Sequence, residues 1–172
     1  KDSMVNEVEK DKIATQIAIS AIKFTILRQS IGNDIIFDSS ASISFEGDSG
    51  PYLQYSARRA KSIIEKSAEY LGINNSKILP EYLTKYSSET LERMIVKMEL
   101  VLQRASREYS PQLIAHYLLN LASEFNSYYA NHIFLDEKNL ETSVIRLSIC
   151  QAFYNTMERC LSILGIEIPD KM

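Results

Sequence analysis

Apolar residues recur at every third or fourth position along most of the chain, which is the spacing of one face of an α-helix. Each such stretch has a single apolar stripe and must bury it on a neighbour, so the pattern predicts an all-α fold, a helix bundle. Pro51 can open one of these helices because its missing backbone N–H is not needed in the first turn. The predicted helices cover residues 13–28, 51–71, 88–105, 111–128 and 137–164.

Capping and breaking residues mark the ends of these helices. Ser88 and Ser110 stand where a side chain can cap a helix start, and Gly72 and Gly165 stand just beyond predicted ends, where glycine is common. Residues 73–86 are expected to be a connection. These capping and breaking residues therefore agree with the helix ends that the apolar spacing predicts.

The periodicity changes between residues 34 and 50. Residues 35–37 (Ile-Ile-Phe) and Ile43 with Phe45 form two short β-like runs, separated by Asp38, Ser39 and Ser40. Residues 46–50 form a turn-rich cluster. We expect two short extended segments here, ahead of the helix that starts at Pro51.

Composition sets the class of protein. A chain of 172 residues holds one domain of ordinary size, or one domain and a short piece of another. Apolar residues make up 45% and charged residues 24%, as in a soluble globular protein, and no run approaches the roughly 20 apolar residues of a membrane span. The chain opens on a polar stretch without Met, as expected of a segment that begins inside a longer protein.

Cysteine and histidine offer no obvious chemistry. Cys150 and Cys160 lie on one predicted helix about 15 Å apart along its axis, beyond the reach of a disulfide. They are expected to be buried thiols in a reducing compartment, in agreement with a cytoplasmic location. His116 and His132 lack the Cys, Asp or Glu neighbours of a metal site. We therefore expect no metal in this chain.

Tyrosines supply the most suggestive pattern. Tyr52 and Tyr55 begin one helix, and Asn126 precedes Tyr128 and Tyr129 near the end of another. Aromatic rings beside amides are platforms for unpaired nucleic-acid bases, although a tyrosine on a helix face is more often a core residue with its hydroxyl at the surface. The net charge of −3 argues mildly against nucleic acid, but a local basic face can exist on an acidic protein.

The segment that leads into the second predicted helix carries a specific pattern. Residues 45–55 read Phe-Glu-Gly-Asp-Ser-Gly-Pro-Tyr-Leu-Gln-Tyr, and Arg59 follows four positions later. This segment resembles the junction of arginyl-tRNA synthetases between the catalytic domain and the C-terminal helical domain, Phe-x-Gly-x-x-x-Pro-Tyr-x-Gln-Tyr with an arginine four residues on. Arg58 departs from that family, which usually has a small residue there.

The resemblance continues to Met172. Residues 117–129 are similar to the family's Tyr-Leu-x-x-Leu-Ala-x-x-Phe-Asn-x-Phe-Tyr run, and residues 164–172 resemble its typical ending of Leu-Gly-Ile, a proline and a terminal methionine. Residues 143–147 take the place of the family's Asp-Ala-Leu-Arg motif, of which only Arg146 is kept. The resemblance implies that Arg146 touches RNA; alternatively, it holds two helices together through a buried polar contact.

The resemblance implies a division of the chain at residue 50. Residues 1–50 would be the tail of the catalytic domain, and residues 51–172 would be the helical anticodon-binding domain of the type named after the Asp-Ala-Leu-Arg motif. The His-x-Gly-His-type and Lys-Met-Ser-Lys-type motifs that handle ATP in class I synthetases are missing from this sequence. The chain alone is therefore expected to be inactive and to bind no cofactor, while the full enzyme would use ATP with Mg²⁺ to attach arginine to tRNA-Arg.

The resemblance also implies site residues for recognition of the anticodon stem-loop. Asn126, Tyr129 and Met172 are expected to contact splayed bases, and Arg59 and Lys61 are candidates for phosphate contacts, with a solvated helix face as the alternative for the two cations. The expected partner is tRNA-Arg, bound by a monomer without any membrane contact. The rival hypothesis is a helical protein-interaction module that binds no RNA.

Overall fold

Seven helices account for all the regular structure in the described residues, and no strand occurs among them. The structure is a computed structural model that describes residues 7–71, 89–136 and 138–172. The predicted all-α fold is confirmed. The helices are α1 (Glu7–Leu27), α2 (Ser39–Ser42), α3 (Gly50–Leu71), α5 (Thr90–Val96), α6 (Met98–Arg107), α7 (Gln112–Asn131) and α8 (Leu140–Ile163).

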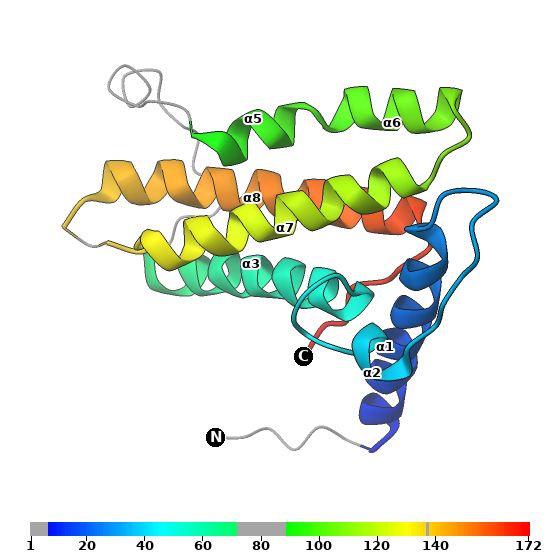
Figure 1. Cartoon of the computed structure of the whole chain (residues 1–172). Helices are drawn as coiled ribbons and strands as arrows, with labels where there is room; N and C mark the ends of the chain where they lie inside the picture. Colours follow the sequence, from blue (N-terminus) through cyan, green and yellow to red (C-terminus); the bar gives the residue numbers. More distant parts are fainter. Residues whose placement is uncertain (1–6, 72–88, 137) are drawn as a thin grey trace.

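The helices α3, α7 and α8 run alongside one another and enclose the core, with α5 and α6 covering α7 and α8 (Figure 1). The stripe predicted for residues 111–128 is buried throughout, from Ile114 to Tyr128. At its centre the ring of Phe125 stacks on that of Phe153 from α8, with 3.8 Å between the centroids. Burial of these apolar faces is the main force that holds the bundle together.

The helix α1 crosses one end of this bundle and packs on α3 (Figure 1). Its buried residues include Ala21 and Phe24, which belong to the stripe predicted from the sequence. The contact with α3 is close, because a Cβ atom built on Gly50 would lie 2.5 Å from the carbonyl oxygen of Ser20. Gly50 therefore lets the two backbones approach where any other residue would push them apart.

The prediction of two short β-like runs is wrong. Residues 35–37 have no regular structure, and Ile43 follows the single turn of α2. The carboxylate of Asp38 caps α2 by accepting hydrogen bonds from the backbone N–H groups of Ser40 and Ala41, at 2.9 and 3.1 Å. A strand needs a partner for its backbone N–H and C=O groups, and no described segment pairs with these runs.

Helix boundaries differ from the prediction at several points; α1, for example, begins at Glu7 and not at residue 13. The helix expected over residues 88–105 is interrupted at Lys97, which ends α5 and begins α6. Glu89 and Glu92 form a capping box at the start of α5, and the cap predicted at Ser88 lies outside the described residues, as do the stop at Gly72 and the connection over residues 73–86. Apolar spacing survives a one-residue break, which is why periodicity alone did not detect it.

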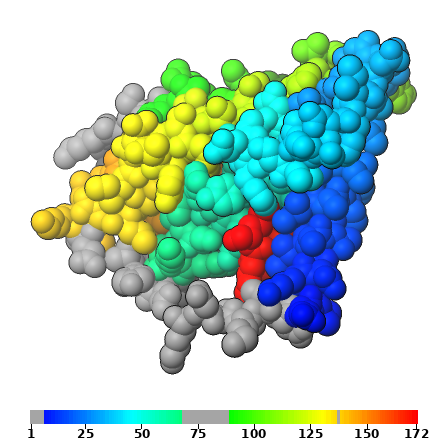
Figure 2. Space-filling view, turned by 60° about the horizontal axis from the view of Figure 1, so that its bottom comes forward, coloured from blue at the N-terminus to red at the C-terminus, as the bar shows by residue number. Residues whose placement is uncertain are grey.

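The end of α8 sets up the last part of the chain. Gly165 has a φ of +68°, and the N–H of Ile166 donates to the carbonyl of Leu161 at 2.9 Å, which is the hydrogen-bonding pattern of a Schellman motif. Glycine adopts this left-handed conformation without a steric penalty. The chain therefore reverses at Gly165, and residues 166–172 return between α1 and α3, where they reach the surface (red in Figure 2).

Candidate nucleic-acid interface

Arg59 on α3 lies between two aromatic rings. Its guanidinium carbon is 4.8 Å from the ring centroid of Tyr55, one turn earlier on α3, and 4.9 Å from that of Tyr129 on α7. Both distances allow a cation–π interaction. Because Tyr55 and Tyr129 are 37% and 41% exposed, the guanidinium group between them lies close to the surface.

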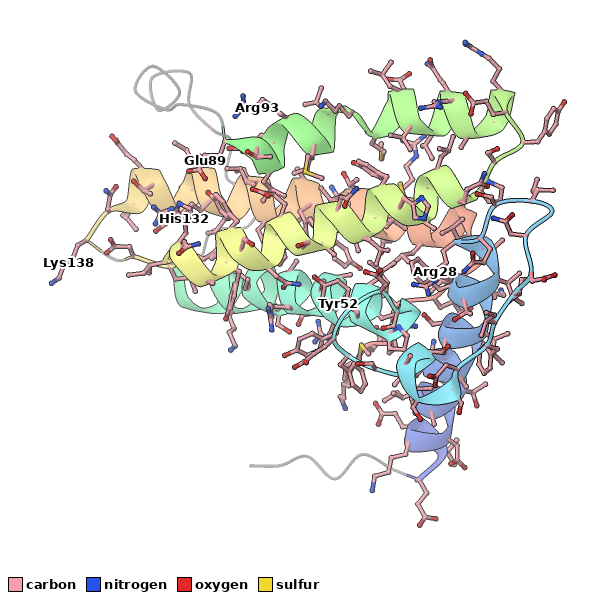
Figure 3. The ribbon with its side chains drawn as sticks, viewed as in Figure 1. Arg28, Tyr52, Glu89, Arg93, His132 and Lys138 are labelled. Carbon is pink, nitrogen blue, oxygen red and sulfur yellow. The ribbon has the colours of Figure 1, made fainter. Side chains whose placement is uncertain are left out.

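Asn126 supports Arg59 from the protein side. Its Oδ1 accepts a hydrogen bond from Nη1 of Arg59 at 2.7 Å, and its Nδ2 donates to the hydroxyl oxygens of Tyr52 and Ser56, each at 3.0 Å. Figure 3 labels Tyr52 on α3, facing α7. Asn126 is therefore placed behind the exposed groups, where it orients Arg59, and the amide itself is already engaged at three points.

A pocket of about 240 Å³ opens beside Arg59. It is formed by one face of α3, by Tyr129 of α7 and by Met172, whose side chain is 40% exposed. The structure thus brings together Arg59, Tyr129 and Met172, three residues that the sequence analysis selected. The described lining consists of Tyr55, Arg58, Arg59, Ser62, Ile63, Lys66, Tyr129 and Met172.

The pocket is locally basic on a chain of net charge −3. Among its described lining residues Arg58, Arg59 and Lys66 carry positive charge, and none has a carboxylate side chain. Nη2 of Arg58 bonds Oε2 of Glu65 at 2.9 Å, while its Nη1 is buried without a hydrogen-bond partner among the described residues. An anionic group is the kind of ligand that this charge distribution attracts.

Lys61, selected as a phosphate contact, lies away from the pocket. Its Nζ forms an ion pair with Oδ1 of Asp170 at 3.3 Å, on the side of α3 that faces α8. Lys61 therefore contacts the end of the chain in this structure, and the predicted RNA contact stays a prediction.

Arg146, the remainder of the Asp-Ala-Leu-Arg motif, also lies apart from the pocket. Its Nη1 donates to the carbonyl oxygen of Ile133 at 2.7 Å and so ties α8 to the segment that follows α7. Nearby, His132 pairs with Glu89 at 3.4 Å, which links the end of α7 to the start of α5 (Figure 3). The bond from Arg146 is exposed and joins α8 to the backbone beyond α7, so it is not a buried contact between two helices, and the RNA contact of Arg146 stays a prediction.

Several pocket residues were not selected from the sequence. Tyr55 was noted only as one possible base platform, and Arg58 and Lys66 were not proposed as ligands. Their spacing from Tyr55 to Lys66 follows one face of a helix, so the period of α3 could have revealed them once Arg59 was chosen. Tyr128, by contrast, is buried against His132, with 4.1 Å between the ring centroids, and belongs to the core.

The cysteines are structural. Both are buried, and burial raises the pKa of Cys150 to about 12 and that of Cys160 to about 11. Among the described residues, no three His, Cys, Asp or Glu side chains gather closely enough to hold a metal ion. No helix within these residues has the length and apolar character required to cross a membrane.

Comparison with known proteins identifies the class to which this bundle and basic pocket belong. The sequence profile of the DALR anticodon binding domain matches residues 53–172. The chain therefore belongs to the DALR anticodon-binding domain family. The match covers α3 and every later helix, and thus all elements that form the pocket.

The relatives with the same segment are arginine–tRNA ligases. The ligase of Streptococcus agalactiae is 35% identical over 167 residues, which are 97% of this chain and 29% of that protein. The ligase of Borrelia duttonii is 32% identical over 97% of this chain and 28% of its own length. The arginyl-tRNA synthetase of Thermus thermophilus has a similar structure, with a TM-score of 0.79 and 30% identity over 95% of this chain and 28% of that one. The chain thus spans less than a third of these relatives.

Proposed function

We propose that this chain is the tRNA-reading part of an arginine–tRNA ligase and binds the anticodon loop of tRNA-Arg in the pocket beside Arg59. The observation that carries the proposal is the arrangement of Arg59 between Tyr55 and Tyr129 in a basic pocket closed by Met172. Membership of an anticodon-binding family supports the same ligand.

The chemistry of the pocket suits unpaired RNA. The exposed ring of Tyr129 and the thioether of Met172 offer stacking surfaces for bases. Arg59 has five N–H donors, of which two bond Asn126 and Tyr55, so others can reach a base edge or a phosphate. Arg58 and Lys66 add positive charge along the RNA backbone. The pocket therefore supplies stacking, directed hydrogen bonds and charge together.

Binding of purified chain to tRNA-Arg, compared with a tRNA of another anticodon over a series of salt concentrations, tests this function. We expect tighter binding to tRNA-Arg and a steep loss of affinity with salt, because cations at phosphates release counterions. Tyr129→Ala should weaken binding by about tenfold or more, from the loss of one stacked base. The matched control is Tyr109→Ala, which removes an 83% exposed tyrosine outside the pocket.

Equal binding of both tRNAs, or equal effects of the two tyrosine variants, would reject the proposal. Affinity that is insensitive to salt would favour the protein-interaction module instead. Each variant is first checked by circular dichroism so that a loss of fold is not taken for a loss of contact.

We further propose that residues 1–50 are the tail of a catalytic domain. They lie ahead of the family match, which begins at residue 53. The helix α1 buries Ala21 and Phe24 on one side, yet on the other Ile19, Ile22 and Ile26 are 43%, 49% and 45% exposed. Exposed apolar side chains gathered on one face of a helix usually mark a surface that packs against another domain. A catalytic domain packed on this second face would hold ATP, Mg²⁺ and arginine in a monomeric cytoplasmic enzyme.

A chimera tests the assignment to the complete enzyme. This chain would replace the matching segment of the Streptococcus agalactiae relative, and arginylation of tRNA-Arg would be measured. We expect activity from the chimera and none from the isolated chain. In the chimera, Tyr129→Ala should raise the KM for tRNA, while ATP-dependent arginine–tRNA ligation by the catalytic part persists at saturating tRNA. Turnover by the isolated chain would overturn this division of labour.

A further inference from the structure

We propose that Gln54 and Lys61 are positioning residues that dock the C-terminal segment, residues 165–172, and thereby place Met172 in the pocket. The inference rests on the proposed function and assigns a role to two groups that this function has not used. Gln54 belongs to the Pro-Tyr-x-Gln-Tyr pattern, and Lys61 was selected from the sequence for a different task. Neither residue lines the pocket beside Arg59.

The C-terminal segment has no regular secondary structure, so side chains must hold it. Ile166 and Pro169 are buried and Ile168 packs against the core, but the last residues, from Asp170 to Met172, are exposed. Polar contacts with α1 hold the segment on one side. They are Nζ of Lys23 to the carbonyl of Gly165, Nε2 of Gln16 to Oε2 of Glu167 at 2.8 Å, and Nζ of Lys171 to Oε1 of Glu9 at 3.1 Å.

Gln54 joins three elements from within. Its side chain is fully buried, and its Nε2 donates to the backbone carbonyls of Glu167, at 2.6 Å, and Gln16, at 3.3 Å. The amide thus links α3 to both α1 and the C-terminal segment. Its Oε1 is buried without a hydrogen-bond partner among the described residues, which costs stability. The side chain of Gln54 therefore contributes to the docking through the two hydrogen bonds that its Nε2 donates.

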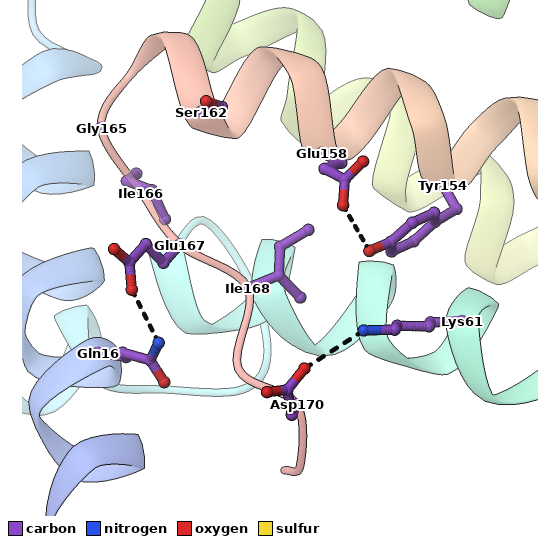
Figure 4. A pocket seen from close by; sticks show the side chains of 10 residues that line it. All are labelled: Gln16, Lys61, Tyr154, Glu158, Ser162, Gly165, Ile166, Glu167, Ile168 and Asp170. Carbon is purple, nitrogen blue, oxygen red and sulfur yellow. Dashed lines mark hydrogen bonds and ion pairs between the residues drawn. The ribbon is translucent and has the colours of Figure 1, made fainter.

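Lys61 fixes the segment near its end. The ion pair with Asp170 joins two residues that line an open hollow of about 480 Å³ between α1, α3, α8 and the segment (Figure 4). Only Lys171 separates Asp170 from Met172, so this pair limits where the methionine can go. Ile166, Ile168 and Pro169 pack the first part of the segment, and polar contacts, among them the Lys61–Asp170 pair, hold its exposed end. Loss of either Gln54 or Lys61 should release Met172 from the pocket.

The position of Met172 can be followed without RNA. The chain has 5 methionines, and the ¹³C-methyl resonance of Met172 is identified by its loss in Met172→Leu. In the unchanged chain we expect it to be displaced by ring currents of the pocket tyrosines. In Gln54→Leu and in Lys61→Ala it should move towards the value of a free methionine. Lys12→Ala, at an exposed lysine of α1, is the control and should leave it in place.

Unchanged Met172 resonances in folded Gln54→Leu and Lys61→Ala would overturn the proposal. If Gln54→Leu fails to fold, Lys61→Ala, at a half-buried side chain, still tests the proposal. A charge exchange, Lys61→Asp with Asp170→Lys, should restore the resonance lost in Lys61→Asp, and failure of this rescue would also count against the proposal.

Binding of a synthetic anticodon stem-loop of tRNA-Arg supplies a second test, in which the direction of the change in affinity distinguishes a positioning role of Lys61 from a phosphate contact. Asp170→Asn removes a negative charge, which by simple electrostatics should strengthen RNA binding. A positioning role predicts the reverse, a loss of about twofold to fivefold from the broken exposed ion pair. Tighter binding by Asp170→Asn would show that Lys61 is a phosphate ligand held back by Asp170. If the stem-loop does not bind the unchanged chain, the proposed function fails, while the methyl resonance still tests the docking.

Discussion

Replacement of Asn126 by alanine tests the network behind the pocket. The change removes two neutral hydrogen bonds, to Tyr52 and Ser56, and one charge-assisted bond from Arg59. At about 1 kcal/mol for each neutral bond and about 2 kcal/mol for the charged one, the upper bound is about 4 kcal/mol. The site is only partly buried, and water can replace some partners, so we expect the free energy of unfolding to fall by about 2 kcal/mol.

Asn126→Ala should also weaken RNA binding. Without Oδ1 of Asn126, only the two rings and the Tyr55 hydroxyl orient Arg59. We expect affinity for tRNA-Arg to fall by about fivefold to tenfold, as for the loss of one good hydrogen bond in a preorganised site. Asn126→Asp keeps the acceptor for Arg59 but adds negative charge, so it should lose less stability than Asn126→Ala and yet bind RNA poorly.

Urea unfolding followed by circular dichroism measures the first effect, and fluorescence anisotropy with labelled tRNA measures the second. The matched control is Asn120→Ala, an exposed asparagine on the same helix, which should leave stability within a few tenths of a kcal/mol or raise it slightly through helix propensity. If Asn126→Ala costs no more stability than Asn120→Ala, the three bonds do not organise the site and the reasoning is refuted.

Three further predictions concern the scaffold. Gly50→Ala should lower the free energy of unfolding by about 1–3 kcal/mol in urea denaturation, because the new methyl group would meet the backbone of Ser20; an unchanged midpoint would refute the close approach of α1 and α3. Tyr109→Gly should raise stability by about 0.5–1 kcal/mol in the same assay, since Tyr109 has a φ of +50° and glycine removes the left-handed penalty; a loss of stability would contradict this. Burial raises the pKa of Cys150 from 9.0 to about 12 and that of Cys160 from 9.0 to about 11. The stability that the two protonated thiols contribute is therefore intact below pH 9 and is lost as the pH rises through these values. Replacement of both by alanine should flatten the fall in stability above pH 9, measured against the unchanged chain.

Helix-scale features followed from the sequence because they depend on local spacing. The stripe from Ile114 to Tyr128 and the helix end at Gly165 each rest on neighbours a few residues apart, and both are observed. The β-like runs of residues 35–37 and 43–45 were wrong for the complementary reason. Apolar residues in a short run fit either a strand or an exposed loop, and only the presence or absence of a pairing partner decides between them.

The sequence by itself therefore determined the helical class and, through a resemblance carried by Pro51, Tyr52, Gln54 and Tyr55, the expected family. It also selected Arg59, Tyr129 and Met172, but not the fact that they meet. Their separation along the chain exceeds any helical period, so only the packing of α3 on α7 and the return of residues 165–172 could join them. The same packing places Lys61 against Asp170 and Arg146 against the backbone of Ile133. The partners of a side chain depend on which residues lie across the interface, and its own residue type does not fix them.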